Sequence, residues 1–257
     1  MYRRLFIWLF GILVILPVAM LVLLSLSGQW VFPGVFPRQW TAGQWANIVK
    51  GSGDLLSSLW LSLFISTSIA LVVTALSFIS GKQIARSKTG RRLLWLTYFP
   101  YVFAPVLLAA ILQFYFIRLG LSSTIQGVLA GHMLITFPYG IILSMSFWNE
   151  RIASMEQLVS TLGGSRRQAW QKVILPLARP VLTIIFFQTF LISWFEYGLT
   201  MVIGVGQVQT LTIKVFQYIN AANINSAAAA SILILVPPLL LLWINKKYLL
   251  VRWQAQD

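Results

Sequence analysis

The sequence predicts an all-α membrane protein with six transmembrane helices, and two observations carry that prediction. Hydrophobic residues make up 58% of the 257 residues and charged residues only 9%, and the mean hydropathy is +0.82. In a soluble domain about a quarter of the residues are charged. Six apolar stretches also reach about the 20 residues that a helix needs to cross a bilayer, and they cover residues 5–26, 58–80, 93–117, 124–148, 180–203 and 227–244. We therefore expect one transmembrane domain over residues 1–257.

The distribution of Lys and Arg predicts how these spans are oriented. When the loops are counted alternately, 15 of the 19 basic residues fall on one side, and the other side holds only Arg38, Lys50, Arg118 and Lys214. Cytosolic loops carry the excess of Lys and Arg, so both termini and the loop at 149–179 are expected in the cytosol. The net charge of +14 is then an orientation signal, and no nucleic-acid partner is expected.

The first span and the segment after it have different compositions. Residues 5–26 exceed the 7–15 apolar residues of a cleavable signal peptide, and no small-residue cleavage site follows cleanly, so we expect a helix that stays. Residues 29–57 carry aromatic side chains among prolines and glycines, which suits an irregular segment and a short helix at the membrane interface. The aromatic residues are an interfacial belt or a docking surface for an external partner; they are Trp30, Phe32, Phe36, Trp40 and Trp45.

The middle and last spans contain prolines, each of which removes a backbone donor. Neighbouring helices or water must then satisfy the freed carbonyl groups. The prolines are ordinary kinks or hinges that line a pathway, and the sequence leaves both open; they are Pro100, Pro105, Pro138, Pro237 and Pro238. In the fourth span, the single histidine, His132, is expected to be a hydrogen-bonded packing residue because no second ligand lies at metal-binding spacing.

The fifth span contains the acidic residue that lies deepest in an apolar segment. An ionisable group inside the bilayer is costly and is by default a functional candidate. Glu196 and its neighbours Trp194 and Tyr197 are therefore candidates for lining a substrate pathway. The alternative is that Glu196 lies near the outer interface, where it is hydrated or pairs with Lys214. The polar segment that follows, 204–226, could meet an external partner.

The residue types and motifs that several kinds of chemistry require are absent from the sequence. The chain has no cysteine and one histidine, so disulfides, iron–sulfur clusters and paired-imidazole haem ligation are excluded. Motifs of zinc proteases, serine hydrolases and ATP-binding P-loops are also missing. No catalytic, metal or cofactor-binding residues are expected. Any work must draw on an ion gradient or on another subunit.

The loop at 149–179 interrupts this apolar pattern with an organised polar segment. Ile152, Met155, Val159 and Leu162 fall on one helical face. Gly163 and Gly164 then break the helix, and a second short helix is expected to run into Leu175 and Pro176. A helix, turn and helix of this kind is suited to contact a cytosolic partner.

The same loop, EQLVSTLGGSRRQAWQKVILPLARP, resembles the EAA loop in permease subunits of ATP-binding-cassette (ABC) importers. That pattern has E-A-A, three residues, G, nine residues, I, one residue and L-P. With its glycine at Gly163, Val173 takes the isoleucine position and Leu175-Pro176 the end. Gln157 replaces the glutamate, Leu158 and Val159 replace the alanines, and Glu156 stands one residue early. The resemblance extends over nearly the whole chain, through six spans and the outer segment QWTAGQWANIVK.

The resemblance implies the type I ABC importer permease fold, with a cytosolic coupling helix-turn-helix, in a bacterial inner membrane. Two ATPase subunits would carry ATP and Mg²⁺, and this chain would bind no cofactor. A second permease subunit, in a heterodimer rather than a homodimer, and an external solute-binding protein would complete the importer. The first loop helix would enter a cleft on an ATPase, with Ser165 and Gln168 capping the second helix and Pro176 closing it. The expected ATPase-docking residues are Met155, Glu156, Gln157, Leu158, Val159, Leu162, Gly163, Gly164, Leu175 and Pro176.

The resemblance is closest to the subgroup that serves polyamines, with relatives for iron(III), thiamine, sulfate and phosphonates. We therefore expect half of a translocation pathway for a small charged solute, with a polyamine or another organic cation first. An ion-coupled secondary transporter or channel is the alternative. That class is expected to show paired ionisable residues or an inverted repeat at the membrane midplane, and the sequence offers only Glu196 and no clear repeat.

Overall fold

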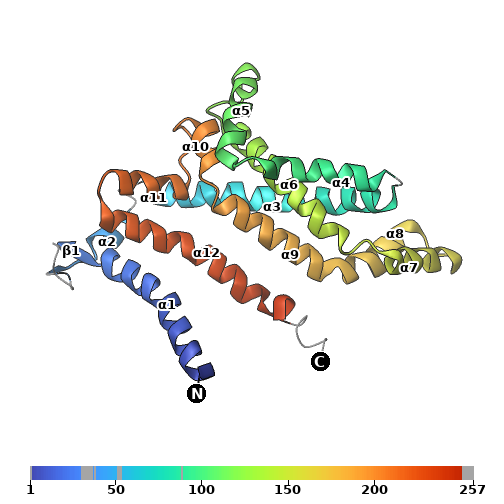
Figure 1. The fold of residues 1–257 in the computed structure, drawn as a ribbon, viewed down its shortest axis with the longest axis horizontal. Coiled ribbons are helices and arrows are strands. Elements are labelled where there is room, and N and C mark those ends of the chain that lie inside the picture. The colour runs from blue at the N-terminus through green and yellow to red at the C-terminus, as the bar shows by residue number, and fades with distance from the viewer. Residues whose placement is uncertain (1, 30–36, 38, 51–53, 88, 251–257) are drawn as a thin grey trace. The chain divides into compact units, whose positions relative to one another are not determined.

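The computed structural model describes residues 2–29, 37, 39–50, 54–87 and 89–250, almost all of them helical (Figure 1). The chain divides into two compact units. The first contains residues 1–62 and 209–240, and the second contains residues 63–208 and 241–257. In the described part of the chain, five helices are long and apolar enough to cross a membrane.

The first unit contains the long N-terminal helix and most of the last helix. Its elements are α1 (Tyr2–Ser25), β1 (Ser27–Gln29), β2 (Gln39–Trp40), α2 (Gly43–Val49), the first turns of α3 (Leu55–Arg86), α11 (Leu211–Asn220) and the first part of α12 (Ile224–Leu250). The two strands pair antiparallel, with Ser27 opposite Trp40, which the sequence did not predict. The expected short helix is α2. Trp30, Phe32 and Phe36 lie outside the described residues.

Polar contacts join the loops and helix ends of this unit. The Leu211 N–H donates to Ser62 Oγ over 2.7 Å, and Ser226 Oγ donates to Gln44 Oε1 over 3.0 Å. Lys214 Nζ lies 3.3 Å from Asp54 Oδ2. Lys214 therefore has Asp54 as an acidic partner within this unit.

The second unit contains the rest of α3 and the loop at 149–179. Its other elements are α4 (Gly90–Tyr98), the 3₁₀ turn η1 (Phe99–Val102), α5 (Pro105–Arg118), α6 (Ile125–Met145), α7 (Glu150–Thr161), α8 (Arg166–Gln168), the π-helical segment η2 (Ala169–Ile174), α9 (Leu175–Trp194) and α10 (Gly198–Gly204). α3 and α6 cross closely. A Cβ on Gly81 would lie 2.0 Å from Ser144 Oγ, and one on Gly140 would lie 2.6 Å from Ser77 Oγ.

Two of the predicted spans are not single helices. The span predicted at 93–117 is divided into α4, η1 and α5. Pro100 lies in the 3₁₀ turn, the backbone is extended at Phe103 and Ala104, and Pro105 begins α5. Proline fits the first turn of a helix, where its missing N–H is not needed, and disfavours helical backbone in the residue before it. Hydropathy alone therefore joined two helices into one.

The span predicted at 180–203 is also divided, since α9 ends at Trp194 and α10 begins at Gly198. By contrast, Pro138 lies within α6, and Pro237 and Pro238 lie within α12, without ending either helix. The prolines therefore occur in two settings: Pro100 and Pro105 lie where α4 gives way to α5, and the other three lie inside continuous helices.

Candidate functional site

The first half of the 149–179 loop is the helix α7, which is capped at both ends by its own sequence. Asn149 Oδ1 accepts from the Ile152 N–H at the N-terminus over 3.1 Å. At the C-terminus the Gly163 and Gly164 N–H groups donate to the carbonyls of Ser160 and Val159 over 3.1 and 2.9 Å. These bonds satisfy carbonyl groups that the last helical turn leaves free.

The two glycines at this turn are needed for different reasons. Gly163 has φ +76°, a left-handed conformation that costs an L-residue about 1–2 kcal/mol. A Cβ on Gly163 would meet no other atom, whereas one on Gly164 would lie 2.5 Å from Val159 Cγ1 and 2.9 Å from the Val159 carbonyl oxygen. The first glycine supplies the backbone angle and the second allows a close backbone approach.

The second half of the loop begins as the sequence predicts and then departs from the prediction. Ser165 caps α8, and a reciprocal capping box with Gln168 is present, with bonds of 2.8 and 3.3 Å. Pro176, however, closes no helix, and that prediction is wrong. The backbone widens into the π-helical η2, so that Pro176 falls in the first turn of α9, where a missing N–H costs little.

α7 has an inner face and an outer face. Ile152 is buried with Phe78, Phe147, Trp148, Ile174 and Ala178, and Met155 packs against this cluster. On the other side, Leu158 is 59% exposed and Leu162 79% exposed, four residues apart and therefore neighbours on the helix surface. The predicted apolar face through Ile152, Met155, Val159 and Leu162 is thus divided between core and surface.

The ten predicted docking residues fall into two groups by exposure. Gln157, Leu158, Leu162, Gly163, Leu175 and Pro176 are exposed, and Met155, Glu156, Val159 and Gly164 are partly buried. The exposed members of α7 and its turn, Gln157, Leu158, Leu162 and Gly163, are called the outer face below. They are the part of the predicted site on α7 and its turn that is exposed in the isolated chain.

Glu156 points away from the outer face and toward α3. Its Oε1 lies 2.8 Å from Lys82 Nζ, and Arg86 donates to its Oε2. Burial by itself would raise the pKa of Glu156, but the hydrogen bonds and charges of Lys82 and Arg86 outweigh it and lower that pKa below its ordinary value. Because Lys82 and Arg86 are 74 and 70 residues away in the sequence, no local pattern could have found this contact.

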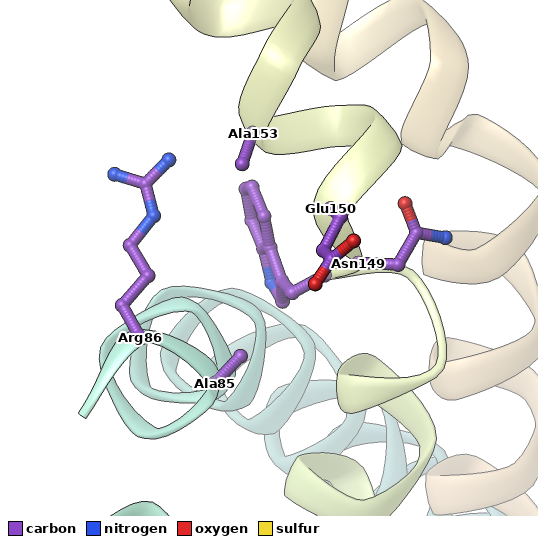
Figure 2. A pocket seen from close by; sticks show the side chains of 6 residues that line it. Ala85, Arg86, Asn149, Glu150 and Ala153 are labelled. Carbon is purple, nitrogen blue, oxygen red and sulfur yellow. The ribbon is translucent and has the colours of Figure 1, made fainter. Parts of the chain in front are cut away.

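A cleft lies beside this ion pair, between the end of α3 and the start of α7. It has a volume of about 340 Å³ and is lined by Ala85, Arg86, Trp148, Asn149, Glu150 and Ala153. Figure 2 shows Ala85 and Arg86 on α3 facing Asn149, Glu150 and Ala153 at the start of α7. One guanidinium and one carboxylate at its rim give the cleft both charges.

The predicted pathway residues lie at the end of α9 and in the break before α10, where Tyr197 is the N-cap residue of α10. Glu196 Oε1 accepts from the Leu199 N–H over 2.8 Å, so its carboxylate caps the first turn of α10, where negative charge is favoured. Trp194 is 2% exposed and stacks on Phe190 with ring centroids 5.5 Å apart. Glu196 thus has a structural role in this chain, and Trp194 belongs to the core.

His132 joins α6, α9 and α10 through buried hydrogen bonds. Its Nδ1 lies 2.8 Å from Ser193 Oγ and its Nε2 lies 2.9 Å from Thr200 Oγ1. The prediction of a hydrogen-bonded packing histidine is confirmed. In the described part of the chain no group of three or more His, Cys, Asp or Glu side chains could hold a metal ion.

Comparison with known proteins gives relatives along nearly the whole chain. No protein-family model matches. The chain is 26% identical to PhnV of Salmonella choleraesuis strain SC-B67, described as a 2-aminoethylphosphonate transport system permease, over 96% of this chain and 93% of that protein. It is 25% identical to the maltose/maltodextrin transport system permease MalG of Vibrio parahaemolyticus, over 90% and 86%.

A solved structure has the same fold. It is a bacterial ABC transporter involved in the import of the acidic polysaccharide alginate, and the match covers 96% of this chain and 95% of that chain with a TM-score of 0.70 and 18% sequence identity.

Proposed function

We propose that this chain, which is an ABC importer permease subunit, forms one half of a translocation pathway and is driven by ATPase subunits that dock on its 149–179 loop. The observation that carries the proposal is the outer face of α7. Two large apolar side chains, Leu158 and Leu162, are exposed on a helix whose inner face is packed and whose turn is built from two glycines. An amphipathic helix that exposes apolar side chains can dock in an apolar groove of a partner.

The partners follow from the docking element. α7, here called the coupling helix, enters a cleft on an ATPase subunit, and a second permease subunit presents its own coupling helix to a second ATPase. ATP and Mg²⁺ bind to the ATPases, and this chain performs no hydrolysis. A heterodimer of permeases and an external solute-binding protein complete the assembly.

We propose a multi-pass inner-membrane location with both termini in the cytosol. The positive-inside count places Lys82, Arg86 and the coupling helix on the same side. Their contact through Glu156 supports that common placement. Cysteine accessibility can test the orientation directly, because the chain contains no natural cysteine.

The solutes named for the relatives favour a solute other than a polyamine. The relatives above name aminoethylphosphonate, maltodextrin and alginate, none of which is a polyamine. The carboxylate that favoured a cation, Glu196, is occupied in capping α10. We therefore place a small organophosphonate or a sugar ahead of a polyamine, delivered in each case by the external binding protein.

The mechanism we propose is alternating access. ATP binding draws the two ATPases together, the docked coupling helices move with them, and the permease pair rocks from an inward-open to an outward-open arrangement. The solute then enters from the external binding protein and is released inward when the ATPases separate. The free energy of ATP binding reaches the permease through contacts between the ATPases and the outer face.

Purification of the chain in mild detergent with its native companions tests the proposal. We expect ATPase subunits and a second permease in the complex. A Leu158→Cys variant is expected to form a cross-link to an ATPase subunit, whereas a Leu119→Cys control is not. Isolation as a lone ion-coupled homodimer would favour a secondary transporter and overturn the proposal.

A further inference from the structure

One buried lysine of α3 lies beside three residues in or next to the loop that carries the coupling helix. Lys82 is 5% exposed. Its Nζ lies 2.8 Å from Glu156 on α7, 5.2 Å from the ring centroid of Trp148 just before α7, and 4.8 Å from that of Trp170 in η2. Ammonium groups at such distances from indole faces are attracted by the ring quadrupole. We call Lys82, Glu156, Trp148 and Trp170 the lysine cage.

Close packing surrounds the part of the cage that faces Phe78 and Ser144, although Trp148 also lines the cleft at the start of α7. Trp148 Nε1–H donates to the Phe78 carbonyl on α3 over 2.9 Å, and the ring centroids of Trp148 and Trp170 lie 5.9 Å apart. Gly81, next to Lys82, has no room for a Cβ against Ser144 of α6. A close-packed interface of this kind transmits displacement because it does not deform continuously.

The chemistry of the cage resists separation of α3 from α7. If the coupling helix moved away alone, the Lys82 ammonium would remain buried without its carboxylate, and an unpaired buried charge is strongly unfavourable. Arg86, more exposed than Lys82, adds a second bond to the same carboxylate. The outer face of α7 remains free while its inner face is held.

We infer that the lysine cage is a transmission joint, in which Lys82 and Glu156 are positioning residues that make α3 move together with the coupling helix when an ATPase pulls on its outer face. This inference rests on the proposed function. It assigns to Glu156 a contact within the chain, where the family resemblance had placed it among the docking residues. It also names α3 as a helix that receives the motion.

Spin labels can test the joint without knowledge of the solute. Because the chain has no cysteine, labels can be placed on Gln83→Cys in α3 and Ser154→Cys in α7, both at exposed positions. The complex with its ATPase subunits is measured by electron paramagnetic resonance without nucleotide and with ATP and Mg²⁺, using a hydrolysis-deficient ATPase. We expect one unchanged distance distribution in both states.

The variants Lys82→Met and Glu156→Gln are expected to shift or broaden that distribution when ATP is added, and Lys82→Arg is expected to restore the native behaviour. A merely structural role would lower the melting temperature and leave the ATP response of the labels unchanged. Glu156→Gln keeps the side-chain shape, so it can be measured in the same way if Lys82→Met fails to fold. The inference is overturned if native labels separate with ATP or if both variants behave as the native chain. Failure of the proposed function would appear differently, as absence of any ATPase in the complex.

Discussion

Truncation of the exposed leucines on the coupling helix should weaken ATPase docking without unfolding the chain. Full burial of a leucine side chain stabilises by about 1.5–3 kcal/mol. Leu162 is 79% exposed and Leu158 59% exposed, so burying the exposed part in an ATPase cleft is worth about 1.2–2.4 kcal/mol for Leu162 and about 0.9–1.8 kcal/mol for Leu158. These are upper values, because alanine keeps the Cβ.

Each 1.4 kcal/mol is a factor of ten in affinity. Leu162→Ala is therefore expected to raise the Kd for the ATPase subunit up to about 7- to 50-fold, and Leu158→Ala up to about 4- to 20-fold. The measurement is a titration of the purified permease pair in nanodiscs with a fluorescently labelled ATPase subunit. Melting temperatures of the same samples are recorded in parallel.

Two control variants separate docking from stability. Ile152→Ala removes a side chain that is 8% exposed and is expected to cost about 2–5 kcal/mol of stability. Leu119→Ala changes a leucine that is 69% exposed at the end of α5, and should alter neither property. An unchanged Kd in Leu162→Ala, or a loss of stability as large as that of Ile152→Ala, would refute the assignment of the outer face.

Three further predictions concern the turn, the buried histidine and pH. Gly163→Ala should lower stability by about 1–2 kcal/mol because its backbone is left-handed. Gly164→Ala should instead bring a Cβ into collision with Val159 and lower the melting temperature further than Gly163→Ala does. Equal melting temperatures of the two variants would contradict this. His132→Ala leaves two buried hydroxyl groups without their partner, and each should cost about 1–3 kcal/mol of stability. Thermal unfolding is measured against His132→Asn, and a loss of stability below about 1 kcal/mol would show that the network is not needed. The pKa of Glu156 is lowered in the folded chain, so its ionised carboxylate stabilises the fold fully at pH values above the unfolded-state pKa of about 4.3. This stabilisation should be lost as the pH falls through the folded-state pKa. Melting temperatures measured across pH should show the loss in the native chain and not in Glu156→Gln, and parallel pH profiles would count against it.

The sequence by itself determined the features that depend on local chemistry. The long apolar stretches predict membrane spans, and each span must be helical because no water satisfies its backbone groups inside the bilayer. The turn at Gly163, the cap at Ser165 and its partner Gln168 involve residues within a few positions of each other, and each appears in the structure as predicted. The fold class follows from these elements and agrees with the solved ABC importer fold.

Only the tertiary structure decided which side chains of the loop are free. A helical pattern puts apolar residues on one face, but it cannot say where that face meets the core, and here the boundary separates Met155 from Leu162. The partner of Glu156 is Lys82 of α3, which lies 74 residues earlier in the sequence. The carboxylate of Glu196 caps α10 only because α9 ends at Trp194. Such contacts depend on where distant segments meet, and packing of the whole unit sets that position.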